Sequence, residues 1–237
     1  MLFVLVPYRA TNQPQRVEQL ERFMQVMPAL LPDARFVVLE QVDSRKFNRG
    51  LLFNACVHEL ALADDDTLCL HDVDLIPEGA LLDEYTRALP PRTARHIGHA
   101  ALAGLQRYST FKRSAHCFGG VSLIRVHDFV RVNGFPNDFW GWGGEDTVLG
   151  LRVCRCAPPA ITIERSVGVL RDMEDIQSHS AKMQQLRDTK SMGKSIHAMV
   201  RKYKKGALFA NGLAQARYRV AACNTHSAFW HLRIDCA

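Results

Sequence analysis

The sequence predicts an α/β protein with a central, mostly parallel sheet flanked by helices. Apolar runs typical of buried strands occur at residues 2–6, 35–39 and 67–71, and segments with helical periodicity lie between them at 14–31 and 51–63. This alternation indicates parallel strands joined by covering helices. Ligands of such sheets bind beyond the carboxyl ends of the strands, so the residues that follow each strand are the first site candidates.

Each element has a local cause in the sequence. The run at 2–6 is continuously apolar up to Pro7, and 14–31 repeats apolar residues along one helical face. Residues 172–206 are polar and helical in composition, which predicts surface helices or a mobile segment. The remaining expected elements are a strand at 121–125, a short helix at 127–132, a helix after Glu145, and late strands at 218–222 and 229–234.

The composition permits a large core and argues against several classes of protein. Of 237 residues, 47% are apolar, but no run of about eighteen apolar residues predicts a membrane span. A late basic run either attracts phosphates, nucleic acid or acidic glycans, or forms a solvated helix face. It lacks a recognised motif and interleaved aromatic residues apart from Tyr203, so we expect no nucleic-acid partner. The net charge is +6, and the run comprises Lys182, Arg187, Lys190, Lys194, Arg201, Lys202, Lys204 and Lys205.

The seven cysteines do not form a zinc motif, because their number is odd and no CxxC pair occurs. Cys56, Cys69 and Cys154 lie inside apolar runs and are expected to be reduced core residues. This pattern favours a reducing compartment.

Two acidic residues follow the third predicted strand in the sequence HDVDLIP. Asp72 and Asp74 alternate in an extended chain, so both carboxylates are expected on one face of the strand end. Paired carboxylates on a rigid edge suit a hard divalent cation such as Mn²⁺ or Mg²⁺, which can bridge a diphosphate. The alternative is that these acids cap the next turn.

A second cluster lies in FWGWGGED, residues 139–146. Its glycines allow backbone conformations that other residues avoid, so Trp142 is expected to swing over a ligand and exclude water. Glu145 and Asp146 then begin a helix, where the helix dipole stabilises acidic residues. The alternative is a functional role, in which one of them is the base that takes a proton from an attacking hydroxyl.

These stretches together resemble the β-1,4-galactosyltransferase family, whose members are inverting, metal-dependent glycosyltransferases with a GT-A (Rossmann-like) fold. The late HLRIDC, residues 231–236, is most similar to the branch that galactosylates protein-linked xylose. The matching elements are PYR (7–9), FNRG (47–50), DVDLIP (72–77), FGGVS (118–122), NGFPNDFWGWGGED (133–146) and NGLAQARYRV (211–220).

The resemblance implies a single GT-A domain over residues 1–237, with a nucleotide-binding half at 1–80 and an acceptor-binding, catalytic half at 81–237. Asp146 would be the catalytic base, Glu145 would hold the acceptor sugar, and Trp142 would close over the donor. The donor would be UDP-galactose, the acceptor a glycan or glycoconjugate, and the metal Mn²⁺ on Asp74. The nucleotide sugar would contact Pro7, Tyr8, Arg9, Phe47, Arg49, Asp72, Val73, Cys117, Gly120 and Trp142.

The sequence departs from the family pattern at two informative places. Asp172 and Glu174, in LRDMED, stand where the family carries metal-binding histidines; we expect them to join Asp74 as ligands and to shift preference towards Mg²⁺. The alternative is a degenerate site with solvated acids. Cys117 replaces a tyrosine that limits space beside the donor sugar, which predicts that UDP-GalNAc is accepted as well as, or instead of, UDP-galactose.

Alternative functions are a retaining GalNAc-transferase-like enzyme and a non-catalytic module that binds sugar nucleotides or glycans. Family members are normally anchored in the Golgi, whereas this chain starts at its first strand with its own methionine. We therefore expect a soluble cytoplasmic protein, or a Golgi-lumenal one if the chain has been trimmed.

Overall fold

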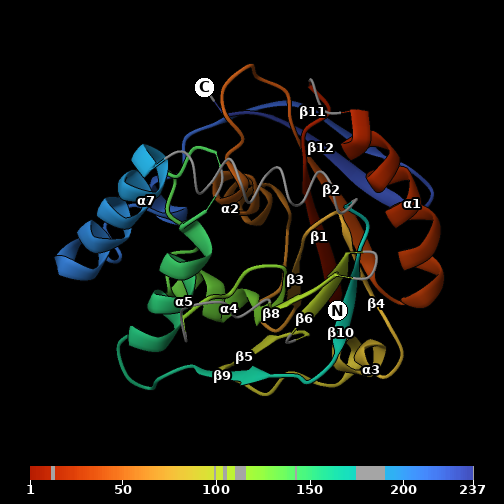
Figure 1. The fold of residues 1–237 in the computed structure, drawn as a ribbon, viewed down its shortest axis with the longest axis horizontal. Helices are drawn as coiled ribbons and strands as arrows, with labels where there is room; N and C mark the ends of the chain where they lie inside the picture. The colour runs from red at the N-terminus through yellow and green to blue at the C-terminus, as the bar shows by residue number, and fades with distance from the viewer. Residues whose placement is uncertain are drawn as a thin grey trace.

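The protein, described by a computed structural model at residues 1–11, 14–98, 100–103, 106–109, 116–141, 143–174 and 190–236, is built around one large sheet (Figure 1). Its eight strands lie in the order β11-β12-β2-β1-β3-β8-β5-β9. In chain order they are β1 (Leu2–Tyr8), β2 (Arg35–Gln41), β3 (Thr67–His71), β5 (Thr93–His96), β8 (Val121–Arg125), β9 (Thr162–Arg165), β11 (Arg219–Thr225) and β12 (Phe229–Asp235).

The sheet is mixed. As predicted, β1, β2 and β3 are mutually parallel, and β12 and β9 also pair in parallel with β2 and β5. The pairings β3–β8, β8–β5 and β11–β12 are antiparallel. The strand–helix rhythm that predicts parallel neighbours stops after β3, which is why the sequence pattern missed these reversals.

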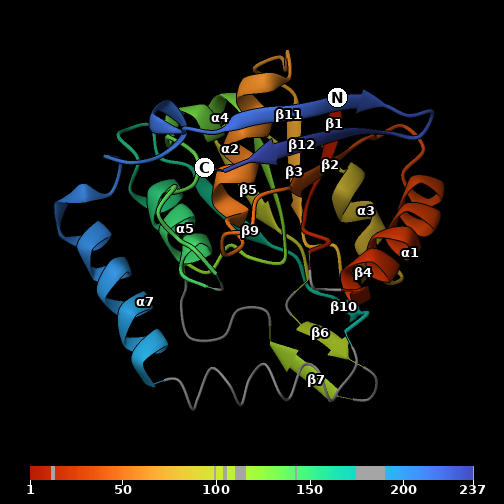
Figure 2. The same cartoon turned by 90° about the horizontal axis from the view of Figure 1, so that it is seen from above.

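A smaller sheet and several helices surround the large sheet. The small sheet has the order β4-β10-β6-β7, with β6 and β7 projecting from the main body (Figure 2). Its strands are β4 (Leu75–Pro77), β6 (Ala100–Ala103), β7 (Gln106–Ser109) and β10 (Val169–Asp172). The helices are α1 (Pro14–Leu30), α2 (Arg49–Glu59), α3 (Leu81–Thr86), α4 (Val126–Arg131), α5 (Glu145–Arg155), α7 (Lys190–Lys202), the π-helical turn η1 (Tyr203–Ala207) and the 3₁₀ turn η2 (Leu213–Gln215).

Two cores cover the two faces of the large sheet, as the alternation of side chains along β1 requires. Phe3 and Leu5 pack with buried residues of α2, α4 and α5. Val4 and Val6 pack with buried residues of α1 and α3 on the other face. Figure 2 shows α1 and α3 on one side of the sheet and α2, α4 and α5 on the other.

Most predicted elements are present, with small errors at their ends. β1 continues through Pro7 to Tyr8. Its pairing with β3 ends at Leu5, so β3 requires no hydrogen bond from the N–H that Pro7 lacks. α2 begins two residues early because the Asn48 side chain accepts from the Leu51 N–H and caps it. It ends at Glu59, earlier than predicted, since Leu60 is already extended.

The prediction of a buried Cys154 is wrong. All seven cysteines are free thiols, but Cys154 is exposed on α5 and Cys156 is buried instead. The helical phase of α5 turns its core face towards Val153 and away from the next residue. Among the described helices, none combines the length and the apolar character needed to cross a bilayer.

Candidate active site

A cavity of about 360 Å³ opens where the carboxyl ends of β1 and β3 meet the start of α5. We call it the strand-end cavity. Two of its residues, Arg16 and Lys46, had no predicted role, and Gly141 of the glycine-rich stretch also lines it. The structure brings together here most of the predicted nucleotide-sugar and catalytic residues, namely Pro7, Tyr8, Arg9, Phe47, Arg49, Asp72, Val73, Asp74, Glu145 and Asp146.

Arg49 connects the two acidic motifs. It lies in the first turn of α2 with its side chain only 10% exposed, so its charge requires partners. Its Nε lies 2.8 Å from Asp72 Oδ1, and its Nη1 lies 2.5 Å from Asp146 Oδ1 and 4.0 Å from Glu145 Oε1. One buried guanidinium therefore holds the acid after β3 beside the acids that begin α5, although the sequence separates them widely.

Glu145 and Asp146 form the first turn of α5 in different environments. Glu145 is 6% exposed, and its Oε2 has no hydrogen-bond partner among the described residues. Burial, reinforced by the neighbouring Asp146 carboxylate, raises the pKa of Glu145 to about 8. Glu145 is therefore largely neutral near pH 7. The Asp146 side chain is more exposed, at 24% against 8% for the Glu145 side chain, and contacts Arg49.

The raised pKa of Glu145 predicts a pH-dependent stability. The folded state binds more protons than the unfolded state between the ordinary pKa of 4.5 and about 8, so stability falls as pH rises through this window. Glu145→Gln removes that loss. In EDTA, its melting temperature relative to wild type should rise by roughly 6–12 °C between pH 5 and pH 8, which corresponds to about 3 kcal/mol at about 1.4 kcal/mol per pH unit.

The exposed Glu18→Gln on α1 provides the control, because its side chain lies at the surface. The difference in melting temperature between Glu18→Gln and the wild type should be the same at pH 5 and at pH 8. An equal pH response of both variants would contradict a raised pKa at Glu145.

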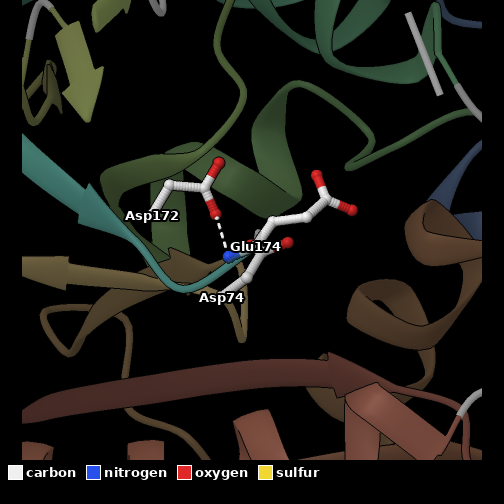
Figure 3. A group of neighbouring side chains, drawn as sticks. All are labelled: Asp74, Asp172 and Glu174. Atoms are coloured by element: carbon white, nitrogen blue, oxygen red, sulfur yellow. Dashed lines mark hydrogen bonds between the residues drawn. The ribbon is translucent and has the colours of Figure 1, made fainter. Parts of the chain in front are cut away.

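A second group of acids gathers beside the cavity from two chain segments. Asp74 follows β3, Asp172 ends β10, and Glu174 lies just beyond; one ligand oxygen from each lies within 4.8 Å of the others (Figure 3). The antiparallel pairing of β10 with β4 places Asp172 opposite Leu75 and so beside Asp74. The Glu174 N–H donates to Asp172 Oδ1 at 2.8 Å, which Figure 3 marks. Three carboxylates at this spacing match the oxygen-donor set of a hard divalent cation.

Arg16, on α1, also reaches this acidic group. Its Nη1 lies 2.5 Å from Asp74 Oδ2 and its Nη2 lies 3.7 Å from Glu174 Oε1. No sequence signal points to this role, because Arg16 occupies a polar position of an ordinary amphipathic helix. Only the packing of α1 against the sheet brings it to the strand-end cavity.

The glycine pair before β8 shapes the site without lining the cavity. A Cβ atom on Gly119 would lie 2.4 Å from Asp146 Oδ2, so any side chain there would displace Asp146. Gly120 has a φ of +73°, and its carbonyl accepts the Asp72 N–H at 3.0 Å. Gly120 was predicted to let the donor approach; in the structure it fixes the Asp72 backbone.

Cys117 also lies outside the residues that line the cavity, although it was predicted to contact the donor. Its carbonyl accepts from Arg165 at 3.3 Å. Burial and the nearby Asp146 carboxylate raise the pKa of the Cys117 thiol. Cys117 is therefore close to Asp146.

Asparagine side chains link three of the matching stretches, residues 47–50, 133–146 and 211–220, by hydrogen bonds. Asn48, which caps α2, donates to the Asn137 carbonyl, and Asn54 of α2 donates to the Asn137 side-chain oxygen, each at 2.8 Å. Asn137 in turn donates to the Asn211 side chain at 2.9 Å and to the Gly212 carbonyl at 2.7 Å. The asparagines of these motifs thus form a partly buried hydrogen-bond network that holds the loop before α5.

Trp142 lies outside the described residues, as do residues 175–189 of the segment predicted to be mobile. The flanking loop is described: Gly141, Gly143 and Gly144 all have φ values between +94° and +100°. Arg45 stacks over the Trp140 ring at 4.4 Å. α7, the predicted surface helix, packs near this loop through Ile196, which lies close to Gly143 and Gly144.

Solved structures establish the class of fold. The catalytic domain of Drosophila β1,4-galactosyltransferase 7, in complex with xylobiose, matches with a TM-score of 0.70 and 23% identity over 99% of this chain and 93% of that chain. A mutant of the Drosophila protein, in complex with manganese, UDP-Gal and xylobiose, matches with a TM-score of 0.72. The protein therefore has a GT-A-type α/β fold, as the sequence predicted.

Sequence comparison then identifies the family. A family model for the N-terminal region of glycosyl transferase group 7 matches residues 2–83, and one described as the N-terminal domain of galactosyltransferase matches residues 100–179. Human β-1,4-galactosyltransferases 3 and 5 are 36% and 40% identical over 154 and 155 residues. These matches cover 63% of this chain but only 36% and 37% of the relatives' length. The chain belongs to the β-1,4-galactosyltransferase family.

Proposed function

We propose that this protein is an inverting hexosyltransferase that moves galactose from a UDP-sugar to a sugar hydroxyl of a glycan or glycoconjugate. The observation that carries the proposal is the Arg49 bridge, which brings Asp72 and the Glu145–Asp146 pair to one cavity. The relatives named above are β-1,4-galactosyltransferases, and one structural neighbour was solved with manganese, UDP-Gal and xylobiose. Family membership favours inversion over the retaining alternative.

Within this function, the half at 1–80 holds the donor. Phe47, Arg49 and Asp72 contact the uridine and its ribose, as the family resemblance implies. Arg9, Arg16 and Lys46 give the same cavity three further cationic side chains, which favours a diphosphate. Arg16 exchanges its contacts with the acids for contacts with phosphate oxygens.

Asp74, Asp172 and Glu174 would hold Mn²⁺, or Mg²⁺, because their carboxylate oxygens are close enough to share one ion. When bound, the ion neutralises the negative charge that develops on the departing UDP.

The half at 81–237 provides the acceptor chemistry. Asp146 takes the proton of the attacking hydroxyl, and Arg49 holds the Asp146 carboxylate in place for that transfer. Neutral Glu145 orients the acceptor sugar by hydrogen bonding, and Trp142 closes over the donor and excludes water. The reaction is one in-line displacement at the anomeric carbon.

Donor choice is proposed to depend on Cys117. The side chain lies close to Asp146 and is smaller than the tyrosine typical of the family, which leaves room for an N-acetyl group. UDP-GalNAc is then a second donor. Transfer of galactose alone by the purified protein would rule this out.

One observation favours a different class of function, a non-catalytic module that binds sugar nucleotides. Arg16 pairs with both Asp74 and Glu174, so the acidic group is partly neutralised without an ion. Such a module would bind UDP equally well with and without a divalent cation.

Both functions are tested by measuring UDP release from UDP-Gal and UDP-GalNAc, with xylosides and GlcNAc among the acceptors, in Mn²⁺, Mg²⁺ or EDTA. Calorimetric UDP binding is measured in parallel. Metal-dependent release with an acceptor supports the transferase. Metal-independent UDP binding without release across the acceptor panel supports the binding module, and absence of both overturns the proposal.

A further inference from the structure

A buried polar pair lies directly beneath the acidic strand end. His71, the last residue of β3, is 0% exposed, and Tyr85 of α3 is 2% exposed. His71 Nε2 lies 2.9 Å from the Tyr85 hydroxyl, and His71 Nδ1 lies 2.8 Å from the Asp72 carbonyl oxygen. The imidazole also packs edge-on against Phe23 at 4.9 Å.

These contacts assign the tautomer of His71. A carbonyl oxygen only accepts hydrogen bonds, so Nδ1 carries the proton and donates to Asp72. Nε2 is then the acceptor, and the Tyr85 hydroxyl donates to it. Burial lowers the pKa of His71 to about 4, so the ring stays neutral and keeps this arrangement at ordinary pH.

The bond fixes a peptide unit on which the site depends. The Asp72 carbonyl also accepts the Leu75 N–H at 3.3 Å, while the Asp72 N–H donates to Gly120 at 3.0 Å. The turn from Asp72 to Leu75 carries the Asp72 and Asp74 carboxylates, which point to Arg49 and Arg16. A rotation of this turn would move both carboxylates together.

Packing alone does not require a histidine at this position. A leucine would fill a similar apolar space against Phe23 and would need no buried partner such as Tyr85. The polar pair therefore has a use that an apolar core residue lacks, namely a hydrogen bond aimed at the Asp72 backbone.

We propose that His71 is a positioning residue for donor binding: its Nδ1–H locks the turn that presents Asp72 and Asp74, and Tyr85 holds the ring in the required tautomer. The inference rests on the proposed function, because it assigns those carboxylates to the nucleotide sugar and its cation. It adds two residues outside the cavity to the machinery of the site.

The test compares His71→Asn, His71→Leu and Tyr85→Phe by calorimetric UDP binding in Mn²⁺, with melting temperatures measured in parallel. The Asn amide places a donor near the position of Nδ1, whereas Leu places none. We expect a Kd about 10-fold or more weaker for His71→Leu, within about 3-fold of wild type for His71→Asn, and between these values for Tyr85→Phe. Where activity is measurable, the loss should appear in the KM for the UDP-sugar more than in kcat.

Tyr218→Phe is the matched control, because the Tyr218 hydroxyl donates to Glu59 at the surface and that contact is exposed. The control should bind UDP like wild type. Wild-type binding by both His71→Leu and Tyr85→Phe would overturn the inference alone, as would equal losses in His71→Asn and His71→Leu. If wild type itself binds no UDP, the inference falls together with the proposed function. If His71→Leu does not fold, the comparison of His71→Asn with Tyr85→Phe still tests the inference: UDP binding should be weaker in Tyr85→Phe than in His71→Asn, and equal binding would overturn the inference.

Discussion

Replacement of Asp146 with Asn should lower kcat by about 10²–10⁴-fold, the range associated with loss of a general base. The substitution keeps the shape of the side chain, and the Asn oxygen can still accept from Arg49 Nη1. It removes the ability to take up a proton from the acceptor hydroxyl. UDP binding and the melting temperature should stay close to wild-type values, because the donor contacts and the packing of α5 are preserved.

The matched control is Asp33→Asn, an exposed acid between α1 and β2. It should leave kcat unchanged. If Asp146→Asn kept more than roughly a tenth of wild-type kcat, Asp146 would not be the base. Glu145, the other acid in this turn, would then be the next candidate.

Replacement of Arg152 with Met should cause the largest loss of stability. Arg152 is 0% exposed on α5 and donates to the carbonyls of Leu208, Asn133 and Gly134 at 2.7–2.8 Å, and to that of Asn211. Met fills a similar volume but satisfies none of these carbonyls, each of which costs about 1–3 kcal/mol when buried without a donor. We expect a loss on the order of 3–5 kcal/mol, or roughly 10 °C in melting temperature for a chain of this size.

Two further variants test whether the loss of stability comes from the carbonyl contacts of Arg152. Arg155→Met changes an exposed arginine on the same helix and should alter the melting temperature little. Arg152→Lys keeps a charge but cannot reach all the carbonyls at once, so its stability should lie between Arg152→Met and wild type. A melting temperature for Arg152→Met equal to that of Arg155→Met would show that the carbonyl contacts contribute nothing. The rate of amide hydrogen exchange in residues 208–211 should rise in Arg152→Met, because the Arg152 bonds to the Leu208 and Asn211 carbonyls are lost.

The elements that the sequence predicted well depend on residues close together in the chain. The strand at 67–71 has the predicted bounds, and the helix at 14–31 differs by one residue, because apolar periodicity is a local property. The acids after β3 and at the start of α5 also lie at the predicted ends of their elements. Short strands such as β4 and β10 have no periodicity that a sequence window could detect.

The sequence by itself determined the strand–helix order of the first half, the family motifs and the set of acids available to the site. Tertiary structure alone decided how those acids are used. Arg16 meets Asp74 and Glu174 only because α1 and β10 contribute to the same core, and Arg49 joins Asp72 to Asp146 only because α2 and α5 cover the same face. Burial raises the pKa of Glu145, whose side chain is 8% exposed, whereas the side chain of the adjacent Asp146 is 24% exposed. The order of two neighbouring acids in the sequence does not predict this difference. The physical reason is that charge, burial and hydrogen bonding depend on neighbours in space, whereas periodicity depends on neighbours in sequence.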